Sequence, residues 1–252
     1  MIELRTLRQC YGDHTVVDVD ALTLPEGGLT SIIGPNGAGK SSLLGMIAGL
    51  QSPTQGQVVL DGQDIVRVKR DSFARRLAFL RQDNTINARL TVRDLVGFGR
   101  YPYSKGRLTD HDQRHMDHAI ALVGLEPQQH SFLDELSGGQ RQRAFIAMVL
   151  AQNTGYALFD EPLNSLDIRH AVGVMHLLRR AVEEHDKTVV VVLHDLNFAA
   201  RHSDRIIAMR DGRIVADGPP EAVIRTEILD DLYDMKLQVV QQCGRPMVDM
   251  FG

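Results

Sequence analysis

The feature that most constrains this chain is the stretch from Gly34 to Ser41, with the sequence Gly-Pro-Asn-Gly-Ala-Gly-Lys-Ser. It fits G-x-x-x-x-G-K-[ST], the pattern of a phosphate-binding loop, which needs a strand before it and a helix after it. Residues 29–33 form a short apolar run that predicts a buried strand, and residues 42–50 carry apolar side chains at helical spacing. The sequence therefore predicts the strand, loop and helix in the order that phosphate binding requires.

The chemistry of this loop follows from its residue types. Glycines allow backbone N–H groups to turn inward, and a helix beginning near Lys40 points its positive end at the same place. Lys40 supplies a charge for the β- and γ-phosphates, and Ser41 offers a hydroxyl to Mg²⁺. The alternative, a glycine-rich turn with a solvated lysine, is disfavoured by the flanking strand and helix. The predicted ATP-binding residues of this segment are Gly34, Pro35, Asn36, Gly37, Ala38, Gly39, Lys40, Ser41 and Ser42.

Composition limits the class of protein. The chain has 252 residues, 43% hydrophobic and 24% charged, and a net charge of −4, which gives no sign of a nucleic-acid surface. Cys10 and Cys243 stand far apart and are expected to be reduced thiols of a cytosolic protein. No export signal is visible, and the longest aliphatic run, Val189–Leu193, is far shorter than the roughly 20 residues of a membrane span. Any role at a membrane would therefore need a separate partner chain.

The predicted secondary structure divides into a sheet-containing core and a helical insertion. Residues 2–24 alternate apolar and polar side chains, which predicts two antiparallel strands, and residues 85–155 change to helical patterns. Within the insertion we expect helices over 91–100, 109–122 and from Ser137, with a loop over 101–108. Further elements expected in the core are strands at 57–62, 77–80, 156–160 and 189–193, a helix over 168–184, a hairpin over 205–216 and a helix over 220–233.

Two carboxylates follow a predicted apolar strand, at Asp160 and Glu161. An aspartate at this position can hold Mg²⁺, and the adjacent glutamate can accept a proton from an attacking water. Neighbouring carboxylates at the end of a buried strand repel each other unless a cation lies between them. The alternative is an exposed acidic turn, which the phosphate loop makes the weaker interpretation.

A second glycine-containing helix start carries a family resemblance. Leu136-Ser137-Gly138-Gly139-Gln140 places a serine cap and two glycines before a helix, and it lies between the phosphate loop and Asp160. With these motifs the whole chain resembles the ATP-binding cassette (ABC) ATPases. The resemblance implies an α/β fold of the P-loop NTPase class, in one domain over 1–252. Its nucleotide-binding core would comprise 1–84 and 156–252, with an N-terminal antiparallel β-subdomain, and the helical subdomain would be 85–155.

The resemblance also implies roles for individual residues. Tyr11 would stack on adenine, Gln82 would touch Mg²⁺ and sense the transmembrane partner, and His194 would lie near the γ-phosphate. The implied catalytic residues are Glu161, His194 and Gln82, and the implied Mg²⁺ ligands are Ser41, Gln82 and Asp160. A second copy, bound head to tail, would cover the ATP with Leu136, Ser137, Gly138, Gly139, Gln140 and Asp167. Asp167 lies in the loop Ser165-Leu166-Asp167, which is expected to act across the dimer.

Alternatives remain for some of these residues. Tyr11 could be a partly buried turn tyrosine, and Gln82 a polar strand cap. Leu163 replaces a threonine common in the family, and Leu80-Arg81 stand before Gln82 where a proline is frequent. These departures remove no group that the chemistry needs.

A separate cluster, His111, His115 and His118, has i, i+4, i+7 spacing on one helix face and could hold a metal ion. Interleaved charges favour a solvated face instead.

The cargo is suggested only by subfamily likeness. Residues 96–103, 139–152 and 194–197 are most similar to importer ATPases for iron(III)-siderophore complexes, including ferric citrate, and to their haem and vitamin B12 relatives. The resemblance implies a peripheral protein on the cytoplasmic side of the cell membrane, bound through residues 85–108 to permease subunits and served indirectly by a substrate-binding protein. Alternatives are a haem or vitamin B12 importer ATPase, a soluble non-transport ABC ATPase, or a P-loop kinase.

Overall fold

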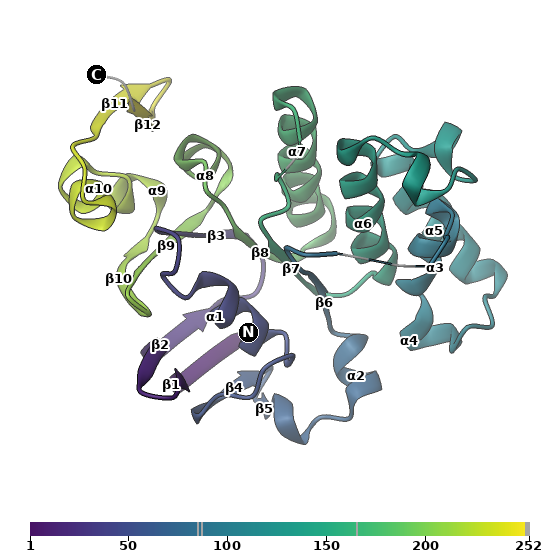
Figure 1. Ribbon diagram of the computed structural model, residues 1–252, viewed down its shortest axis with the longest axis horizontal. Helices are drawn as coiled ribbons and strands as arrows, with labels where there is room; N and C mark the ends of the chain where they lie inside the picture. Colours follow the sequence, from purple (N-terminus) through teal and green to yellow (C-terminus); the bar gives the residue numbers. More distant parts are fainter. Residues whose placement is uncertain (85, 87, 165, 250–252) are drawn as a thin grey trace. The chain divides into compact units, whose positions relative to one another are not determined.

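A computed structural model describes residues 1–84, 86, 88–164 and 166–249 of the chain (Figure 1). The chain forms two compact units, Met1–Val68 with the residues from Thr188 onward, and Lys69–Lys187. The division between a core and an inserted part at 85–155 stays a prediction, because these units are bounded elsewhere.

The first unit holds most of the strands. Its strands are β1 (Ile2–Tyr11), β2 (His14–Leu24), β3 (Leu29–Ile33), β4 (Gln55–Leu60), β5 (Gln63–Asp64), β8 (Thr188–Val192), β9 (Arg205–Arg210), β10 (Arg213–Gly218), β11 (Gln238–Gln242) and β12 (Arg245–Asp249). Its helices are α1 (Lys40–Ile47), α8 (Leu196–His202), α9 (Pro220–Val223) and α10 (Thr226–Tyr233), with a 3₁₀ turn at Ile65–Arg67.

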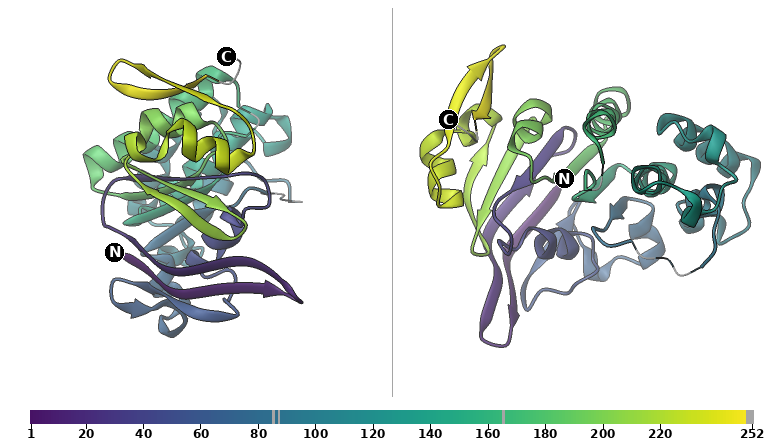
Figure 2. Two further views of the ribbon diagram at one scale, coloured as in Figure 1. Left: turned by 90° about the vertical axis from the view of Figure 1, so that its left-hand side faces the viewer. Right: turned by 45° about the horizontal axis from the view of Figure 1, so that its top comes forward.

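An antiparallel sheet in the order β2-β1-β4-β5 confirms the alternating pattern of the first 24 residues. β1 and β2 form a long twisted hairpin (Figure 2), in which Ile2 pairs with Leu24 and Tyr11 with His14. The apolar residues of the alternation lie inside, because Ile2 and Leu7 are completely buried.

A second set of strands, ordered β10-β9-β3-β8, places the phosphate loop. β3 is buried along its whole length and runs parallel to both β8 and β9. It is buried on both faces, as expected of a central parallel strand, although it includes the polar residues Thr30 and Ser31. The carboxyl ends of β3 and β8 therefore lie at the same edge.

The second unit joins a strand pair to a group of helices. Its elements are α2 (Arg70–Ala74), β6 (Leu77–Leu80), α3 (Val92–Phe98), α4 (Tyr101–Ser104), α5 (Asp110–Leu122), α6 (Gly138–Gln152), β7 (Tyr156–Asp160) and α7 (Ile168–His185), with 3₁₀ turns at Glu126–Gln128 and Leu133–Glu135. β6 and β7 are parallel, and α3, α5 and α6 pack against one another (Figure 1). Thr91, Thr109 and Ser137 each close a reciprocal capping box at the start of a helix, as their sequences predict.

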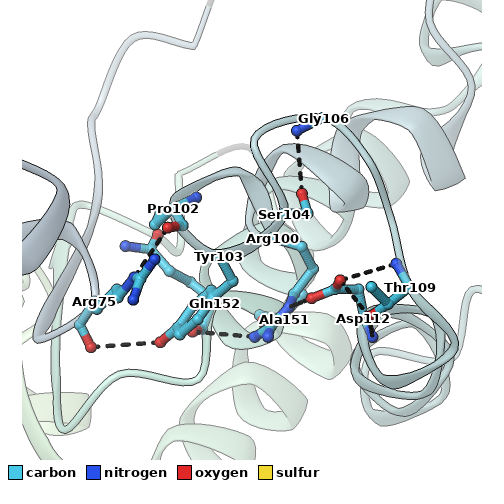
Figure 3. A network of polar contacts seen from close by, with 10 residues as sticks. All are labelled: Arg75, Arg100, Pro102, Tyr103, Ser104, Gly106, Thr109, Asp112, Ala151 and Gln152. Carbon is cyan, nitrogen blue, oxygen red and sulfur yellow. Dashed lines mark hydrogen bonds and ion pairs between the residues drawn. The ribbon is translucent and has the colours of Figure 1, made fainter.

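Arg100 ties the helices of this unit together (Figure 3). Its side chain is 2% exposed; Nε donates to Asp112 Oδ1 at 2.9 Å and Nη1 to the Ala151 carbonyl at 2.8 Å, at the C-terminal end of α6. The guanidinium also lies 4.1 Å from the ring centroid of Tyr103. A cation beside a carboxylate, a helix C-terminus and an aromatic face is well compensated for its burial.

Some local predictions were wrong. Residues 101–108 include the helical turn α4, in which Pro102 occupies a first-turn position where its missing N–H costs nothing. Residues 220–233 form two short helices, α9 and α10, instead of one. The hairpin of β11 and β12 was not predicted at all.

Candidate nucleotide-binding site

In the first unit, the loop after β3 brings backbone segments close together. Gly34 has φ +145°, and a Cβ there would lie 2.1 Å from the carbonyl oxygen of Met209. Gly39 has φ +91°, and a Cβ there would lie 2.4 Å from the carbonyl oxygen of Val16. Both positions therefore exclude any side chain, and the sequence pattern has a steric cause.

The helix α1 presents its N-terminus to this loop. The residue before it is Gly39, and no side chain of the described residues caps the helix or places an acid in its first turn. The positive dipole end of the helix therefore favours an anion at this loop.

Lys40 is folded over the same loop. The residue is 5% exposed, and its Nζ donates to the carbonyl oxygens of Gly34 and Pro35, both at 2.8 Å. An anionic phosphate oxygen is a stronger acceptor for an ammonium group than a neutral carbonyl is. The loop therefore holds the lysine where a bound phosphate could attract it.

Tyr11 and His194 come from neighbouring parts of the first unit. Tyr11 is the last residue of β1 and is 56% exposed. The next strand of the same hairpin, β2, contains Val16, whose carbonyl oxygen lies close to Gly39. His194 is exposed and follows β8, whose Val192 pairs with Ile32 of β3. The strands next to Tyr11 and His194 thus adjoin the phosphate loop and β3, and the roles of the two side chains stay predictions.

In the second unit, three predicted polar residues lie at the carboxyl ends of β6 and β7. These strands are parallel, with Leu80 opposite Phe159, so Gln82 and Glu161 emerge at the same edge. The amide Nε2 of Gln82 donates to Glu161 Oε2 at 2.7 Å. Asp160 is 5% exposed and Glu161 8% exposed, so both carboxylates are buried where charge must be compensated. An exposed acidic turn is excluded.

Two residues that the sequence did not single out hold the segment after β7. Asn164 Nδ2 donates to the same Glu161 Oε2 at 2.6 Å, and Gln142 Nε2 of α6 donates to the Pro162 carbonyl at 3.1 Å. Asparagine is common in turns for reasons unrelated to catalysis, so residue type alone could not have identified Asn164.

The second helix start, at Ser137, is exposed. Ser137 Oγ accepts from the Gln140 N–H at 3.2 Å, and Gln140 Oε1 accepts from the Ser137 N–H at 2.9 Å. Ser137 and Gly138 lie at the surface, before a helix of 15 residues. The geometry fits a donor surface offered to another molecule.

Asp167 is exposed and caps α7 by accepting from the His170 N–H at 2.8 Å. This bond and the His170 side chain lower the pKa of the Asp167 carboxyl. The neighbouring Ser165, predicted to act across a dimer, lies outside the described residues.

The donor set predicted for Mg²⁺ is chemically suitable. Ser41, Gln82 and Asp160 offer a hydroxyl, an amide and a carboxylate oxygen, the hard ligands that Mg²⁺ prefers. Gln82 uses its N–H toward Glu161, so its carbonyl oxygen is the end suited to a cation.

The three histidines of α5, His111, His115 and His118, were considered above as a possible metal site. The rings of His111 and His115 are 4.6 Å apart, and His115 and His118 line a cavity of about 230 Å³ with residues of α6 and α7. Burial and the nearby Arg100 and His111 lower the pKa of His115. Among the described residues, no group of three or more His, Cys, Asp or Glu side chains has the arrangement of a metal site.

A glycine-rich loop between a buried strand and a helix, with a folded lysine, defines a nucleotide-binding protein of the P-loop NTPase class.

Comparison with known proteins gives the family. Residues 17–164 match the family described as ABC transporter. The chain is 49% identical to the petrobactin import ATP-binding protein YclP of Bacillus subtilis (strain 168), over 95% of both chains. It is 39% identical to the ferric enterobactin transport ATP-binding protein FepC of Escherichia coli (strain K12), over 96% of this chain and 91% of that one. It also resembles a dimeric, post-hydrolysis structure of the ATP-binding cassette MJ0796 bound to ADP and Pi, with a TM-score of 0.78, 32% identity, and coverage of 87% of this chain and 98% of that one.

The chain therefore belongs to the ABC transporter family, and it is an ATP-hydrolysing cassette with the α/β fold predicted from its motifs. Among the similar solved structures, the cassette MJ0796 is dimeric, and cbiO1 from Clostridium perfringens is part of an ABC transporter complex.

Proposed function

We propose that this chain is the ATP-hydrolysing subunit of an importer for iron(III)-siderophore complexes, acting with a separate permease. The observation that carries this proposal is the 49% identity to a petrobactin import protein over 95% of both chains. The relative FepC, named for ferric enterobactin transport, adds a second siderophore. No helix of the described residues is long and apolar enough to cross a membrane. The siderophore-import names of the relatives support a separate permease as the membrane channel, with this chain bound to it on the cytoplasmic side.

Within the proposed ATP site, the first unit would bind and orient the nucleotide. Tyr11 stacks on adenine, and the loop from Gly34 through Ser42 surrounds the phosphates with N–H groups. Lys40 neutralises the β- and γ-phosphates, and His194 contacts the γ-phosphate. These groups stabilise charge on an oxygen-rich transition state, which is the main task in phosphoryl transfer.

The second unit would supply the base. Glu161 accepts a proton from the attacking water, and Asp160 and Gln82 join Ser41 as the residues that would hold Mg²⁺. When bound, the cation neutralises charge between the β- and γ-phosphates. Glu161 is 8% exposed, so its carboxylate is largely shielded from bulk water, which supports its role as the base.

A second copy of the chain is proposed to complete each pocket. Ser137, Gly138 and Gly139 at the exposed start of α6 would donate to the γ-phosphate of the partner's ATP, with Leu136, Gln140 and Asp167 beside them. A similar structure at 32% identity is a dimer with ADP and Pi. Groups supplied in trans in other NTPases raise the rate roughly 10³–10⁵-fold.

The partners would be permease subunits and, indirectly, a substrate-binding protein. Phe98 and Tyr101 are 51% and 55% exposed in the segment expected to meet the permease, and exposed apolar side chains of this size suit a protein contact.

The proposal is tested by iron uptake in the native host. Cells lacking this gene should lose uptake of radiolabelled ferric petrobactin or ferric enterobactin. Wild-type protein should restore uptake, and the Glu161→Gln variant, expressed to the same level, should not. Unchanged uptake of both chelates together with lost uptake of vitamin B12 or haem would overturn the assignment of cargo. Unchanged uptake of all of them would overturn the assignment to import.

A further inference from the structure

Two side-chain amides converge on one oxygen of the proposed catalytic base. Gln82 Nε2 and Asn164 Nδ2 lie 2.7 Å and 2.6 Å from Glu161 Oε2. An ionised carboxylate can only accept hydrogen bonds, so both amides must present their N–H groups to it. The orientation of both amides is therefore fixed by the carboxylate, and the orientation of the carboxylate by the amides.

The two donors differ in their distance from Glu161 along the sequence. Gln82 follows β6 and is 79 residues away in sequence, whereas Asn164 is three residues away, in the same turn. The Asn164 N–H also donates to the Glu161 carbonyl at 3.3 Å, which closes that turn. Asn164 and Glu161 thus belong to the same hydrogen-bonded turn, which keeps the two side chains close together.

The turn itself is held in an unusual conformation. Glu161 has φ +51°, a region that residues with a side chain seldom adopt. Gln142 of α6 holds the next residue through the Pro162 carbonyl at 3.1 Å. Glu161 and Pro162 are buried, whereas Asn164 is exposed, so the restraints on this turn are its backbone conformation and the hydrogen bonds of Asn164 and Gln142.

We propose that Asn164 is a positioning residue that keeps the Glu161 carboxylate aimed for hydrolysis when Gln82 exchanges its contact for another partner. The inference rests on the proposed role of Glu161 as base. Glu161 Oε2 accepts hydrogen bonds from both Gln82 and Asn164. If Gln82 moves away with the segment after β6, Asn164 still donates its hydrogen bond to Oε2. A carboxylate that can rotate spends less time in the productive geometry, which lowers the rate of the chemical step without weakening ATP binding.

The test is ATP hydrolysis by purified Asn164→Leu, which has nearly the same shape but no donor. Loss of a hydrogen bond to a charged group predicts that kcat falls roughly tenfold to a hundredfold while KM for ATP changes little. Asn164→Ser, which keeps a short donor, should recover part of the rate. Unchanged or raised kcat in Asn164→Leu, or an equal loss in both variants, would overturn the proposal.

A matched control separates this effect from general damage. The Asn197 side chain also makes two hydrogen bonds, to the backbone N–H and carbonyl of Val248, and neither of them involves a carboxylate. Asn197→Leu should change the thermal transition by a similar amount but leave kcat near the wild-type value. A similar fall in kcat for both variants would mean that Asn164 has only a structural role.

The Glu161→Gln background distinguishes failure of this inference from failure of the proposed base. If Glu161 is the base, Glu161→Gln alone is nearly inactive, and adding Asn164→Leu lowers the residual rate no further, because Asn164 acts through Glu161. Wild-type turnover by Glu161→Gln would show that Glu161 is not the base, and the inference about Asn164 would fail with that proposal. An inactive Glu161→Gln beside a fully active Asn164→Leu would remove the inference alone.

Discussion

At the scale of single residues, the buried ion pair of Arg100 and Asp112 has a measurable consequence. The Asp112 side chain is 5% exposed. Burial alone would raise the pKa of its carboxyl, but the Thr109 N–H and hydroxyl and the Arg100 guanidinium lower it from 3.8 to about 2. Because this folded-state pKa lies below the unfolded value, Asp112 adds stability above pH 3.8 that is lost as the pH falls through about 2.

We predict that this carboxyl contributes about 2 kcal/mol to the free energy of unfolding at neutral pH. Asp112→Asn should be destabilised by about 3–5 kcal/mol, because the Arg100 charge stays buried without its partner. The difference from wild type should shrink between about pH 4 and pH 2 as Asp112 becomes protonated. Urea unfolding across this range measures it, and a difference independent of pH would contradict the prediction.

The residues of the candidate site were largely predictable where the side chain itself carries the chemistry. Lys40 and Glu161 were singled out from motif positions and Gln82 from the family resemblance, and the structure places Gln82 within hydrogen-bond distance of Glu161. Asn164 and Arg100 could not be found in this way. Their roles depend on which side chains the fold brings next to them, and an asparagine in a turn or an arginine in a helical segment is usually exposed.

At the scale of elements, the close packing of α3 against α6 depends on one glycine. A Cβ at Gly99 would lie 2.2 Å from the Met148 carbonyl oxygen. That atom is backbone, so the helices would have to separate. Gly97, two residues earlier, is a matched control, because a Cβ there would meet only side-chain ends, Met116 Cε at 3.4 Å and Leu108 Cδ1 at 3.7 Å.

We predict that Gly99→Ala lowers the free energy of unfolding by about 1–3 kcal/mol through overpacking. Gly97→Ala should be neutral or stabilising by up to about 1 kcal/mol, because alanine favours a helix interior. Thermal unfolding of the two variants measures the difference. Equal effects would show that the approach of the two helices does not limit stability here.

Helices with explicit start signals were predicted well, and those without were not. Thr91, Thr109 and Ser137 each precede a partner three residues later, and each caps a helix. The turn α4 was missed because proline was taken as a loop signal, although it is compatible with a first turn. The β11–β12 hairpin packs on α8, and its exposed, mostly polar first strand gives little periodic signal.

At the scale of the whole molecule, the proposed pocket is incomplete in one copy. The donor surface at Ser137 and the loop at Lys40 are proposed to act on the same nucleotide only when they come from different copies. This arrangement predicts that activity per molecule falls on dilution, because dimers dissociate. Activity per molecule that stays constant down to nanomolar concentration would favour a self-sufficient monomer.

Mixing two inactive variants tests this arrangement more directly. Lys40→Met removes the phosphate charge, and Ser137→Arg blocks the donor surface, so each alone should lose activity roughly a hundredfold or more. In a mixed dimer, one pocket combines the intact Lys40 of one copy with the intact Ser137 of the other. Equimolar mixing should therefore restore hydrolysis that neither variant shows alone, measured as phosphate release against protein concentration. If each copy built its whole pocket from its own chain, every molecule would carry a lesion and mixing would restore nothing.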